Sequence, residues 1–318
     1  MEYIISDSVK LKSQRRSRTR KILKENFPLF IMSLPGMIFL FIFSYLPMFG
    51  VVMAFKDYVP RKGIFGSEWV GFDNFKFFFR TQDAARTIRN TLLYGIDFQV
   101  VNLVMGVVMA LLLFHLKNQR ALKVYHTILM LPRFLSIVIV SFMSYAVLSP
   151  SYGFLNRVIT ALGGEAIAWY YEPKYWPFIL TIVNIWIHLG TGCLYYYAAL
   201  VGIDDSLFEA ASLDGANVLQ KCWHIAIPEL IPIISMMLIL GVGNIVSSNT
   251  GLFYNIPRNS GSLYPTTDVI GTYVYRSMLT GDLQKSSAIG LAQSFTGMIL
   301  VLVTNAIIRK MNPDNAMF

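Results

Sequence analysis

Six long apolar stretches constrain this chain more than any other feature of its sequence. They run near 29–54, 92–115, 124–148, 177–200, 230–249 and 286–308. A helix needs roughly 20 mainly apolar residues to cross a bilayer, and each stretch reaches about that length. The connections between them are all shorter than the roughly 100 residues of a typical further domain. Only 14% of the 318 residues are charged, where soluble domains average about 25%. The sequence therefore predicts an all-α integral membrane protein with six transmembrane helices, not a soluble enzyme.

A basic tail precedes the first apolar stretch. Eight of the 27 Lys and Arg residues lie there: Lys10, Lys12, Arg15, Arg16, Arg18, Arg20, Lys21 and Lys24. This position suits anionic cytoplasmic lipid headgroups, whereas a basic patch alone is weak evidence for nucleic-acid binding. The apolar stretch is longer than the core of a signal peptide, so it should stay as an anchor. We expect a cytoplasmic tail (1–26), a single membrane domain (27–318) and no nucleic-acid partner.

The distribution of basic residues predicts the orientation. An even number of spans places both termini on one side of the membrane. The tail, an acid-free short loop and the last turn of the sixth span are basic, which fits cytoplasmic termini of a multi-pass protein of the plasma or inner membrane; the basic residues outside the tail are Lys117, Arg120, Lys123, Arg309 and Lys310. The aromatic loop 56–90 suits either the outer membrane interface or packing against its own bundle.

The connection 201–228 between the fourth and fifth spans has the pattern of two short helices. Ser206 followed by Glu209 predicts a capping box, Gly215 should end that helix, and a second helix should continue to Trp223. Its apolar residues would stand outside the membrane, where they contact a protein partner or the bilayer surface; they are Leu207, Phe208, Ala211 and Leu219. Small residues that permit close helix approach favour the protein partner: Ala210, Ala211 and Ala216.

Three spaced elements of this connection resemble the EAA signature of binding-protein-dependent ABC importer permeases. They are Glu209-Ala-Ala211, Asp214-Gly-Ala216 and Trp223-His-Ile-Ala-Ile-Pro228. The spacings agree throughout, with Ile227 in place of the usual Leu and Cys222 where Phe is common. The resemblance implies a MetI-like type I importer fold, in which this connection is a pair of coupling helices followed by a turn at 225–228. It assigns contact with an ATPase to Glu209, Ala210, Ala211, Asp214, Gly215, Ala216, Trp223, Ile225 and Pro228.

Shorter elements elsewhere are similar to the carbohydrate branch of these permeases. Val70–Phe75, Asn90-Thr91 and Leu131-Pro132 resemble conserved elements of sugar permeases. Thr272–Arg276 and Asn305–Lys310 resemble the LplB-type branch, which implies import of oligosaccharides or polysaccharide fragments.

The energy for import must come from other chains. The sequence contains no G-x-x-x-x-G-K-[ST] loop that could hold nucleotide phosphates. We therefore expect no cofactor or metal in this chain, with ATP and Mg bound by separate subunits. The resemblance implies a second homologous permease, two ABC ATPase subunits, an extracellular solute-binding protein and a saccharide substrate as partners.

Polar and aromatic residues inside the predicted spans are candidates for the substrate pathway, because unpaired polar groups are costly in lipid. They are Asn184, Trp186, His188, Tyr195, Tyr196, Asn244, Ser247, Ser248 and Asn249. Amides and aromatic faces suit sugars, but such residues also serve as interface anchors or hold helices together. For His188, an interhelical hydrogen bond, substrate contact, and a proton or metal role all remain open.

Three alternatives differ from the saccharide importer. The same fold could carry a peptide, an amino acid or phosphate. An ion-coupled secondary transporter would have a thin proton or sodium route, since only Asp97, Arg133 and His188 are ionisable at or within the spans. A membrane enzyme is disfavoured because the four histidines are scattered and H-E-x-x-H is absent.

Overall fold

The computed structural model describes residues 26–311. The chain divides into two compact units, Met1–Val52 and Met53–Phe318, which are treated separately here. All but the last residue of the predicted basic tail lies outside the described residues, and so do the residues that follow Met311. Whether residues 27–318 act as a single domain stays a prediction.

The described part of the first unit is one apolar helical rod. Asn26–Phe55 is continuously helical for 30 residues, with an α-helical part (26–40), a π-helical turn η1 (Phe41–Tyr45) and a 3₁₀ segment η2 (Leu46–Phe55) that runs into the second unit. Residues 26–49 are exposed on every side of this rod within the chain. A helix that is apolar all round suits a membrane span, which agrees with the first predicted one.

The second unit begins with a small hairpin. Strands β1 (Lys56–Asp57) and β2 (Glu68–Trp69) pair antiparallel, with Lys56 opposite Trp69, and α2 (Gly63–Gly66) lies between them. All other elements of this unit are helical: α3 (Asp73–Arg80), α4 (Gln82–Phe114), α5 (Gln119–Met130), η3 (Leu131–Phe134), α6 (Ile137–Leu148), α7 (Phe154–Ala161), η4 (Trp169–Tyr171), η5 (Pro173–Tyr175), α8 (Trp176–Val201), α9 (Asp205–Leu213), α10 (Val218–Lys221), η6 (Cys222–Ala226), α11 (Ile227–Gly243), α12 (Thr250–Asn255), η7 (Gly261–Leu263), α13 (Tyr264–Thr267), α14 (Ile270–Leu279) and α15 (Leu283–Met311).

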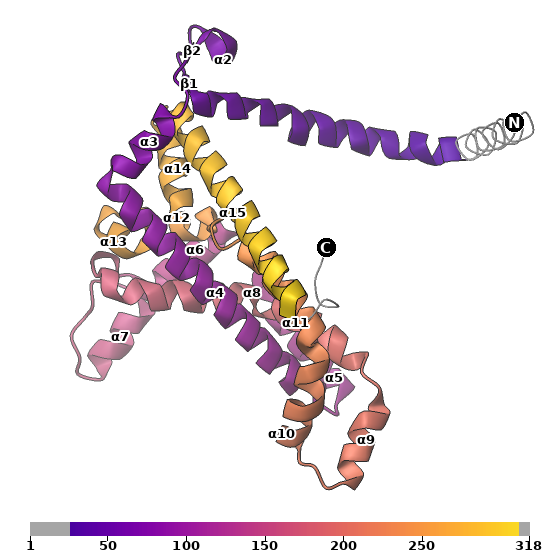
Figure 1. Ribbon diagram of the computed structural model, residues 1–318. Helices are drawn as coiled ribbons and strands as arrows, with labels where there is room; N and C mark the ends of the chain where they lie inside the picture. Colours follow the sequence, from indigo (N-terminus) through magenta and orange to yellow (C-terminus); the bar gives the residue numbers. More distant parts are fainter. Residues whose placement is uncertain (1–25, 312–318) are drawn as a thin grey trace, which may run out of the picture. The chain divides into compact units, whose positions relative to one another are not determined.

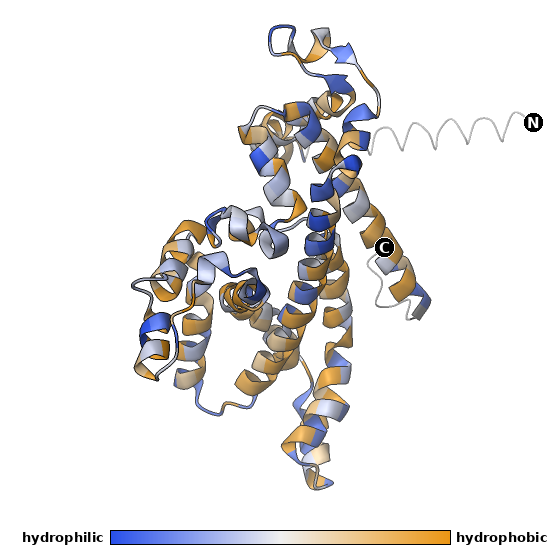
Figure 2. Cartoon of the chain, turned by 90° about the vertical axis from the view of Figure 1, so that its left-hand side faces the viewer, coloured by the Kyte–Doolittle hydropathy of each residue, from blue (hydrophilic) through white to orange (hydrophobic). Residues whose placement is uncertain are grey.

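Five helices of the described residues are long and apolar enough to cross a membrane, and a bent pair could form a sixth span. Within the second unit these are α4, α8, the helix through α10 and α11, and α15. Figure 2 shows apolar residues along the long helices and hydrophilic residues in the hairpin and loops. The predicted all-α membrane fold is therefore confirmed, with helix α4 starting ten residues before the expected 92.

The third predicted span is not one straight helix. Its two parts, Gln119–Phe134 and Ile137–Leu148, are bent by 99°. Pro132 lacks an amide hydrogen for the helix ladder, and Ser136 caps a new helix by accepting a hydrogen bond from the Val138 amide. These two residues explain why the expected continuous helix 124–148 breaks.

The fifth predicted span also differs from the expectation. Helix α11 ends at Gly243, and the next residues up to Asn249 leave the helical conformation. Asn249 then caps α12 by accepting a hydrogen bond from the Leu252 amide at 3.2 Å. The span predicted for 230–249 is therefore six residues shorter at its end, and its last residues form a polar connection.

Helix α8 joins two apolar cores of the second unit. Near its start, Trp176 and Leu180 pack with Leu252 of α12. Near its end, Leu200 packs with Leu230 of α11. Within this unit, Figure 1 shows α3 and the strand hairpin at one end and α9 with α10 at the other. Helix α8 therefore packs against helices that carry the two candidate sites described below.

Candidate functional site

The first candidate site is the hairpin of α9 and α10, which follows the fourth span. Its first helix begins two residues earlier than the predicted capping box implies, because Asp204 is the cap and its carboxylate accepts the Ser206 amide at 2.9 Å. This hydrogen bond lowers the pKa of the Asp204 carboxyl. The expectation that Ser206 and Glu209 form a capping box is wrong, because Ser206 already lies inside the helix.

Gly215 makes the turn between the two helices, as predicted. Its φ of 80° lies in the left-handed region that favours glycine. The Ala216 amide donates to the Ala211 carbonyl at 2.9 Å, and the Gly215 amide donates to the Ser212 carbonyl at 3.2 Å. This pair of bonds is a Schellman motif, which satisfies the last carbonyls of α9. The spacing of the EAA signature around Gly215 therefore has a local structural reason.

The second helix carries the capping box that was expected in the first. Asn217 accepts the Gln220 amide at 2.9 Å, and the Gln220 side chain accepts the Asn217 amide at 2.8 Å. The Lys221 ammonium donates to the Ser212 hydroxyl at 2.6 Å, which ties α10 back to α9. These bonds hold the hairpin as a defined shape.

No turn separates the hairpin from the fifth span. Residues Cys222–Ala226 form a π-helical turn, so that Val218–Gly243 is one helix of 26 residues. Pro228 lies inside this helix, directly after the π-helical turn and at the second residue of α11. The predicted turn at 225–228 is therefore wrong, and any movement of the hairpin would be transmitted directly into this helix.

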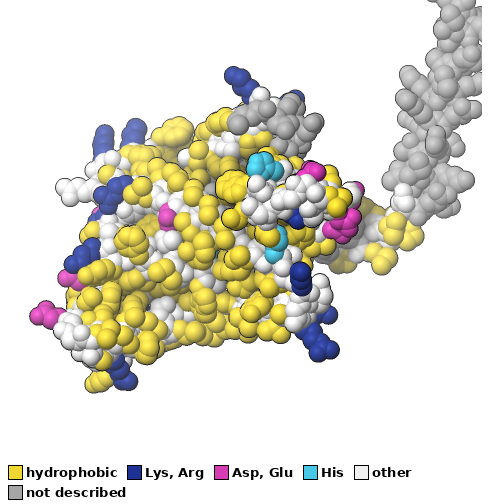
Figure 3. Space-filling view, turned by 90° about the horizontal axis from the view of Figure 1, so that it is seen from below, with side chains coloured by type: hydrophobic (Ala, Val, Ile, Leu, Met, Phe, Trp, Pro, Cys, Tyr) yellow, Lys and Arg dark blue, Asp and Glu magenta, His cyan; other side chains and the backbone are white. Residues whose placement is uncertain are grey.

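The hairpin presents apolar side chains outward. Phe208 points inward and packs its ring 5.5 Å from that of Phe114. The other large apolar side chains of the hairpin are exposed, with Leu213 at 90%, and Trp223, just after α10, is 67% exposed. Glu209 is exposed and has no hydrogen-bond partner in the part of the chain that the structure describes. Figure 3 views this end of the second unit and shows a surface composed largely of hydrophobic side chains.

The second candidate site is a cavity of 260 Å³, here called the amide cavity, between α4, α8 and the end of α11. The Asn184 amide donates to the Asn102 carbonyl oxygen at 3.0 Å, which joins α8 to α4. His188 lies one turn further on and shares a hydrogen bond with the Asn184 backbone carbonyl at 2.9 Å through Nδ1. The other ring nitrogen of His188, Nε2, is therefore available to a ligand in the amide cavity. Polar groups from three helices thus meet between membrane-spanning segments.

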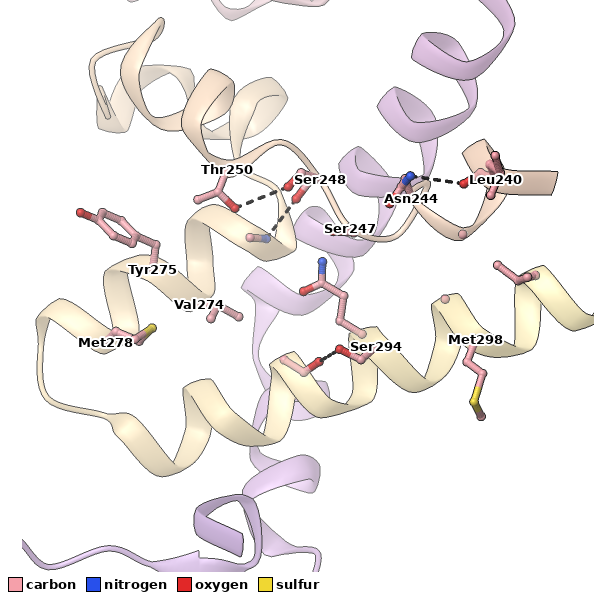
Figure 4. A pocket seen from close by; sticks show the side chains of 16 residues that line it. Leu240, Asn244, Ser247, Ser248, Thr250, Val274, Tyr275, Met278, Ser294 and Met298 are labelled. Atoms are coloured by element: carbon pink, nitrogen blue, oxygen red, sulfur yellow. Dashed lines mark hydrogen bonds between the residues drawn. The ribbon is translucent and has the colours of Figure 1, made fainter. Parts of the chain in front are cut away.

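A larger cavity of 740 Å³, here called the α15 cavity, lies between α11, α14 and α15. The two cavities share Asn244, Ser247 and Ser248. Figure 4 shows these residues on the connection that follows α11, with the Ser248 hydroxyl accepting the Gly271 amide at 3.3 Å. Asn244 donates only to its own helix, at the Leu240 carbonyl, so the rest of its amide remains available to a ligand.

The predicted pathway residues separate into two groups. Asn184, His188, Asn244 and Asn249 line the amide cavity, together with Ser247 and Ser248. The three predicted aromatic residues line neither cavity: Trp186 and Tyr195 are exposed, and Tyr196 is buried in the core at the end of α8. The geometry therefore brings the amides and the histidine together and leaves the aromatic candidates elsewhere.

Several polar lining residues did not stand out in the sequence. Gln99 and Asn102 of α4 face the amide cavity, and Gln293 and Ser294 of α15 face the α15 cavity. Each lies in an apolar span, so the rule that intramembrane polar residues mark a pathway would have identified them.

Two motifs far apart in the sequence meet at Asp268, whose side chain has no exposed surface. Its carboxylate pairs with Arg86 at 2.8 Å and Arg276 at 2.6 Å. Asn90 donates to the Asp268 backbone carbonyl at 2.9 Å, and Thr91 accepts the Ile270 amide at 2.9 Å. The Asn-Thr pair at the start of the second span thus attaches α4 to the start of α14.

Apolar helices of membrane-spanning length, a polar cavity among them and an exposed helical hairpin at one end together define a multi-pass membrane permease. The comparison of the sequence with known families identifies the family of this permease. Residues 102–315 match the family described as the binding-protein-dependent transport system inner membrane component. The chain belongs to this family, which confirms the resemblance based on the EAA signature.

Individual relatives cover nearly all of the chain. Protein LplB of Bacillus subtilis (strain 168) is 34% identical over 294 residues, which is 92% of this chain and 92% of that protein. The polygalacturonan/rhamnogalacturonan transport system permease protein YteP of the same organism is 32% identical, covering 97% and 96%. A crystal structure of a bacterial ABC transporter involved in the import of the acidic polysaccharide alginate has a TM-score of 0.84 and 31% identity, covering 93% and 99%.

Proposed function

We propose that this chain is a permease subunit of an ABC importer for oligosaccharides or polysaccharide fragments. The observation that carries the proposal is the exposed hairpin α9–α10, which continues without a turn into a helix lining both cavities. A force applied to the hairpin by a partner would therefore reach the polar cavities. The chain has no nucleotide-binding loop of its own, so separate ATPase subunits would supply that force.

Support for a saccharide cargo comes from the chemistry of the cavities and from the relatives. Amides and hydroxyls, such as Asn184, Asn244 and Ser247, match the donors and acceptors of sugar hydroxyl groups. The names of YteP and of the alginate transporter refer to polysaccharides. One of the more distant relatives, UgpA of Shigella flexneri, is named for sn-glycerol-3-phosphate, at 26% identity. A small phosphorylated solute is therefore the alternative that the experiment includes.

The implied partners follow from the same proposal. A second homologous permease, two ABC ATPase subunits that bind ATP and Mg, and an extracellular solute-binding protein would complete the importer. A solved alginate transporter was crystallised with a pentasaccharide-bound periplasmic protein and matches this chain with a TM-score of 0.82. With both termini in the cytoplasm, as the basic residues predict, the hairpin would lie on the cytoplasmic side, where ATP is available.

The test is ATPase activity of the reconstituted complex in lipid vesicles. We expect hydrolysis to rise when a saccharide-loaded binding protein is added, and Glu209→Ala to remove most of this rise. Glu165→Ala is the matched control, since Glu165 is also exposed but lies in the loop between α7 and η4. Stimulation by glycerol phosphate or a peptide alone would keep the importer and reject the saccharide. Full stimulation with Glu209→Ala would reject the coupling role.

A further inference from the structure

A third cavity in the second unit shares Tyr94 with the amide cavity and no residue with the α15 cavity. It has a volume of 560 Å³ and lies between residues 89–97 of α4 and the first two turns of α8. Its lining includes Arg89, Leu93, Asp97, Phe178, Thr181 and Ile182. We propose that this α4–α8 cleft binds one anionic phospholipid, with the phosphate at Arg89 and an acyl chain along the apolar wall.

Arg89 lies at the start of the apolar part of α4, where the proposal puts the lipid headgroup. It is the last charged residue before 91–114, a run in which Asp97 is the sole charged side chain. The cleft also contains Phe178, in the first turn of α8, and both helices therefore begin their apolar spans at this end. Lipid phosphates lie beyond the ends of the apolar spans, about 15 Å from the bilayer centre on either side, and an arginine at the end of a span can reach them.

The guanidinium of Arg89 is oriented without being neutralised. Its Nη2 donates to the Pro265 carbonyl at 2.9 Å and to the Asn90 side-chain oxygen at 3.1 Å, and its Nε donates to the same Asn90 oxygen at 3.3 Å. Both acceptors are uncharged. No carboxylate within residues 26–311 pairs with it, whereas Arg86, one turn earlier, pairs with Asp83 and Asp268. An arginine held in place with its charge uncompensated suits a phosphate group, to which its remaining nitrogen, Nη1, can donate charge-assisted hydrogen bonds.

The wall below Arg89 is apolar and open. Leu93 follows Arg89 by one helical turn, and Phe178 and Ile182 face it from α8; they are 61%, 73% and 64% exposed within the chain. In water, this much exposed apolar surface would be unfavourable, but an acyl chain lying in the cleft would cover it. Headgroup contact and acyl contact are therefore continuous, as in basic pockets between transmembrane helices.

Asp97 makes the two ends of the cleft different in charge. It lies eight residues after Arg89, about 12 Å further along the helix, and its carboxylate accepts the Thr181 hydroxyl at 2.5 Å. A negative charge at this depth disfavours the phosphate there and favours it at Arg89. An anionic headgroup fits this arrangement better than a zwitterionic one, because a zwitterion brings its own cation to the uncompensated arginine.

Lipid binding to the purified transporter complex tests the proposal. The complex is delipidated in detergent and titrated with phosphatidylglycerol or phosphatidylcholine of identical acyl chains, and bound lipid is counted by native mass spectrometry. We expect half-saturation with phosphatidylglycerol at a clearly lower concentration. Arg89→Gln should remove this preference, with a shift of about ten-fold, whereas Arg89→Lys should retain most of it.

Two controls separate the cleft from general charge effects. Arg80→Gln removes an exposed arginine at the end of α3 and should leave the preference unchanged. Leu93→Trp fills the apolar wall and should weaken binding of both lipids. The proposal is overturned if Arg89→Gln keeps the preference, if Leu93→Trp binds both lipids as before, or if Ile182→Cys crosslinks to the partner permease in high yield, because protein would then occupy the cleft.

Discussion

Asp268 is a fully buried carboxylate shared by two arginines from different helices. Arg86 belongs to α4 and Arg276 to α14, and the hydroxyl of Thr272 donates a further hydrogen bond at 2.8 Å. Arg86 also pairs with Asp83 at 2.8 Å, whereas Asp268 is the one carboxylate that pairs with Arg276 within residues 26–311. This one residue connects two segments separated by 182 positions in the sequence.

We predict that Asp268→Asn destabilises the protein. The amide keeps the size of the side chain but leaves Arg276 without its anion and Arg86 with Asp83 alone. Removing one partner of a buried pair costs about 3–5 kcal/mol. Thermal unfolding of the purified complex in detergent should show a clearly lower midpoint. Asp73→Asn is the control, because Asp73 forms an exposed pair with Lys76 at 2.9 Å and should leave the midpoint unchanged. Equal midpoints for both variants would contradict the structural role of Asp268.

The residue scale also shows where local sequence rules are ambiguous. Ser206-x-x-Glu209 and Asn217-x-x-Gln220 both have the form of a capping box, and only the second is one. In the first case Asp204, two residues upstream, offers a carboxylate that takes the cap position. The capping-box rule predicts which residue types can cap a helix. Which of them caps α9 depends on where the preceding helix α8 ends, at Val201.

At the scale of elements, the start of α9 should depend on pH. The folded pKa of Asp204 lies below the ordinary value of 3.8 because the carboxylate accepts the Ser206 amide. A lowered pKa means that the cap stabilises α9 above 3.8 and is lost as the pH falls through the folded value. Hydrogen exchange of the α9 amides should therefore lose protection at acidic pH. Asp204→Asn should keep a cap but lose this pH dependence; an unchanged pH profile in that variant would reject the assignment.

The contact between α5 and α8 gives a second prediction at this scale. A Cβ at Gly190 would collide with the backbone of Leu129 and Met130, just before the bend of the third span. Gly190→Ala should therefore force the two helices apart, at about 1–3 kcal/mol. A reduced midpoint of thermal unfolding would show this cost. Gly290→Ala, where a Cβ meets nothing within 4 Å, should not lower the midpoint; if both variants behave alike, the close approach at Gly190 is unimportant.

Hydropathy predicted the existence of the spans better than their shape. The averages that identify a span do not depend on the direction of the backbone, so they could not show the bend at residues 132–136 or the end of α11 at Gly243. Local signals were present at both places: Pro132, the cap Ser136 and the polar run that begins at Asn244. These signals redirect a helix only where the redirected chain can pack against other elements, here against α8 and α12.

At the scale of the whole second unit, the candidate sites differ in how far the sequence predicts them. The hairpin is contiguous in sequence, so its motif could be read directly from residues 201–228. The amide cavity is formed by helices that start almost a hundred residues apart, such as α4 and α8, and no single stretch shows their relative rotation. This is why Asn184 and Asn102 meet, while Trp186, two residues from Asn184, faces away from the cavity.

The last prediction tests whether the cavities conduct the cargo. Asn244 lines both cavities, and its amide makes only one hydrogen bond, to its own helix. Asn244→Leu should preserve assembly but remove a hydrogen bond to a sugar hydroxyl, a loss of about 1–1.5 kcal/mol. Saccharide uptake into proteoliposomes that contain the complete importer should then fall about ten-fold in kcat/KM.

Tyr195→Phe is the matched control for this experiment, because Tyr195 was predicted from the sequence as a pathway residue but lines neither cavity. Uptake with this variant should stay within about two-fold of the original, since no hydrogen bond to the cargo is lost. If Asn244→Leu transports normally and Tyr195→Phe does not, the pathway follows the exposed aromatic face of α8. That result would show that the cargo passes outside the polar cavities, independently of the role of the hairpin α9–α10.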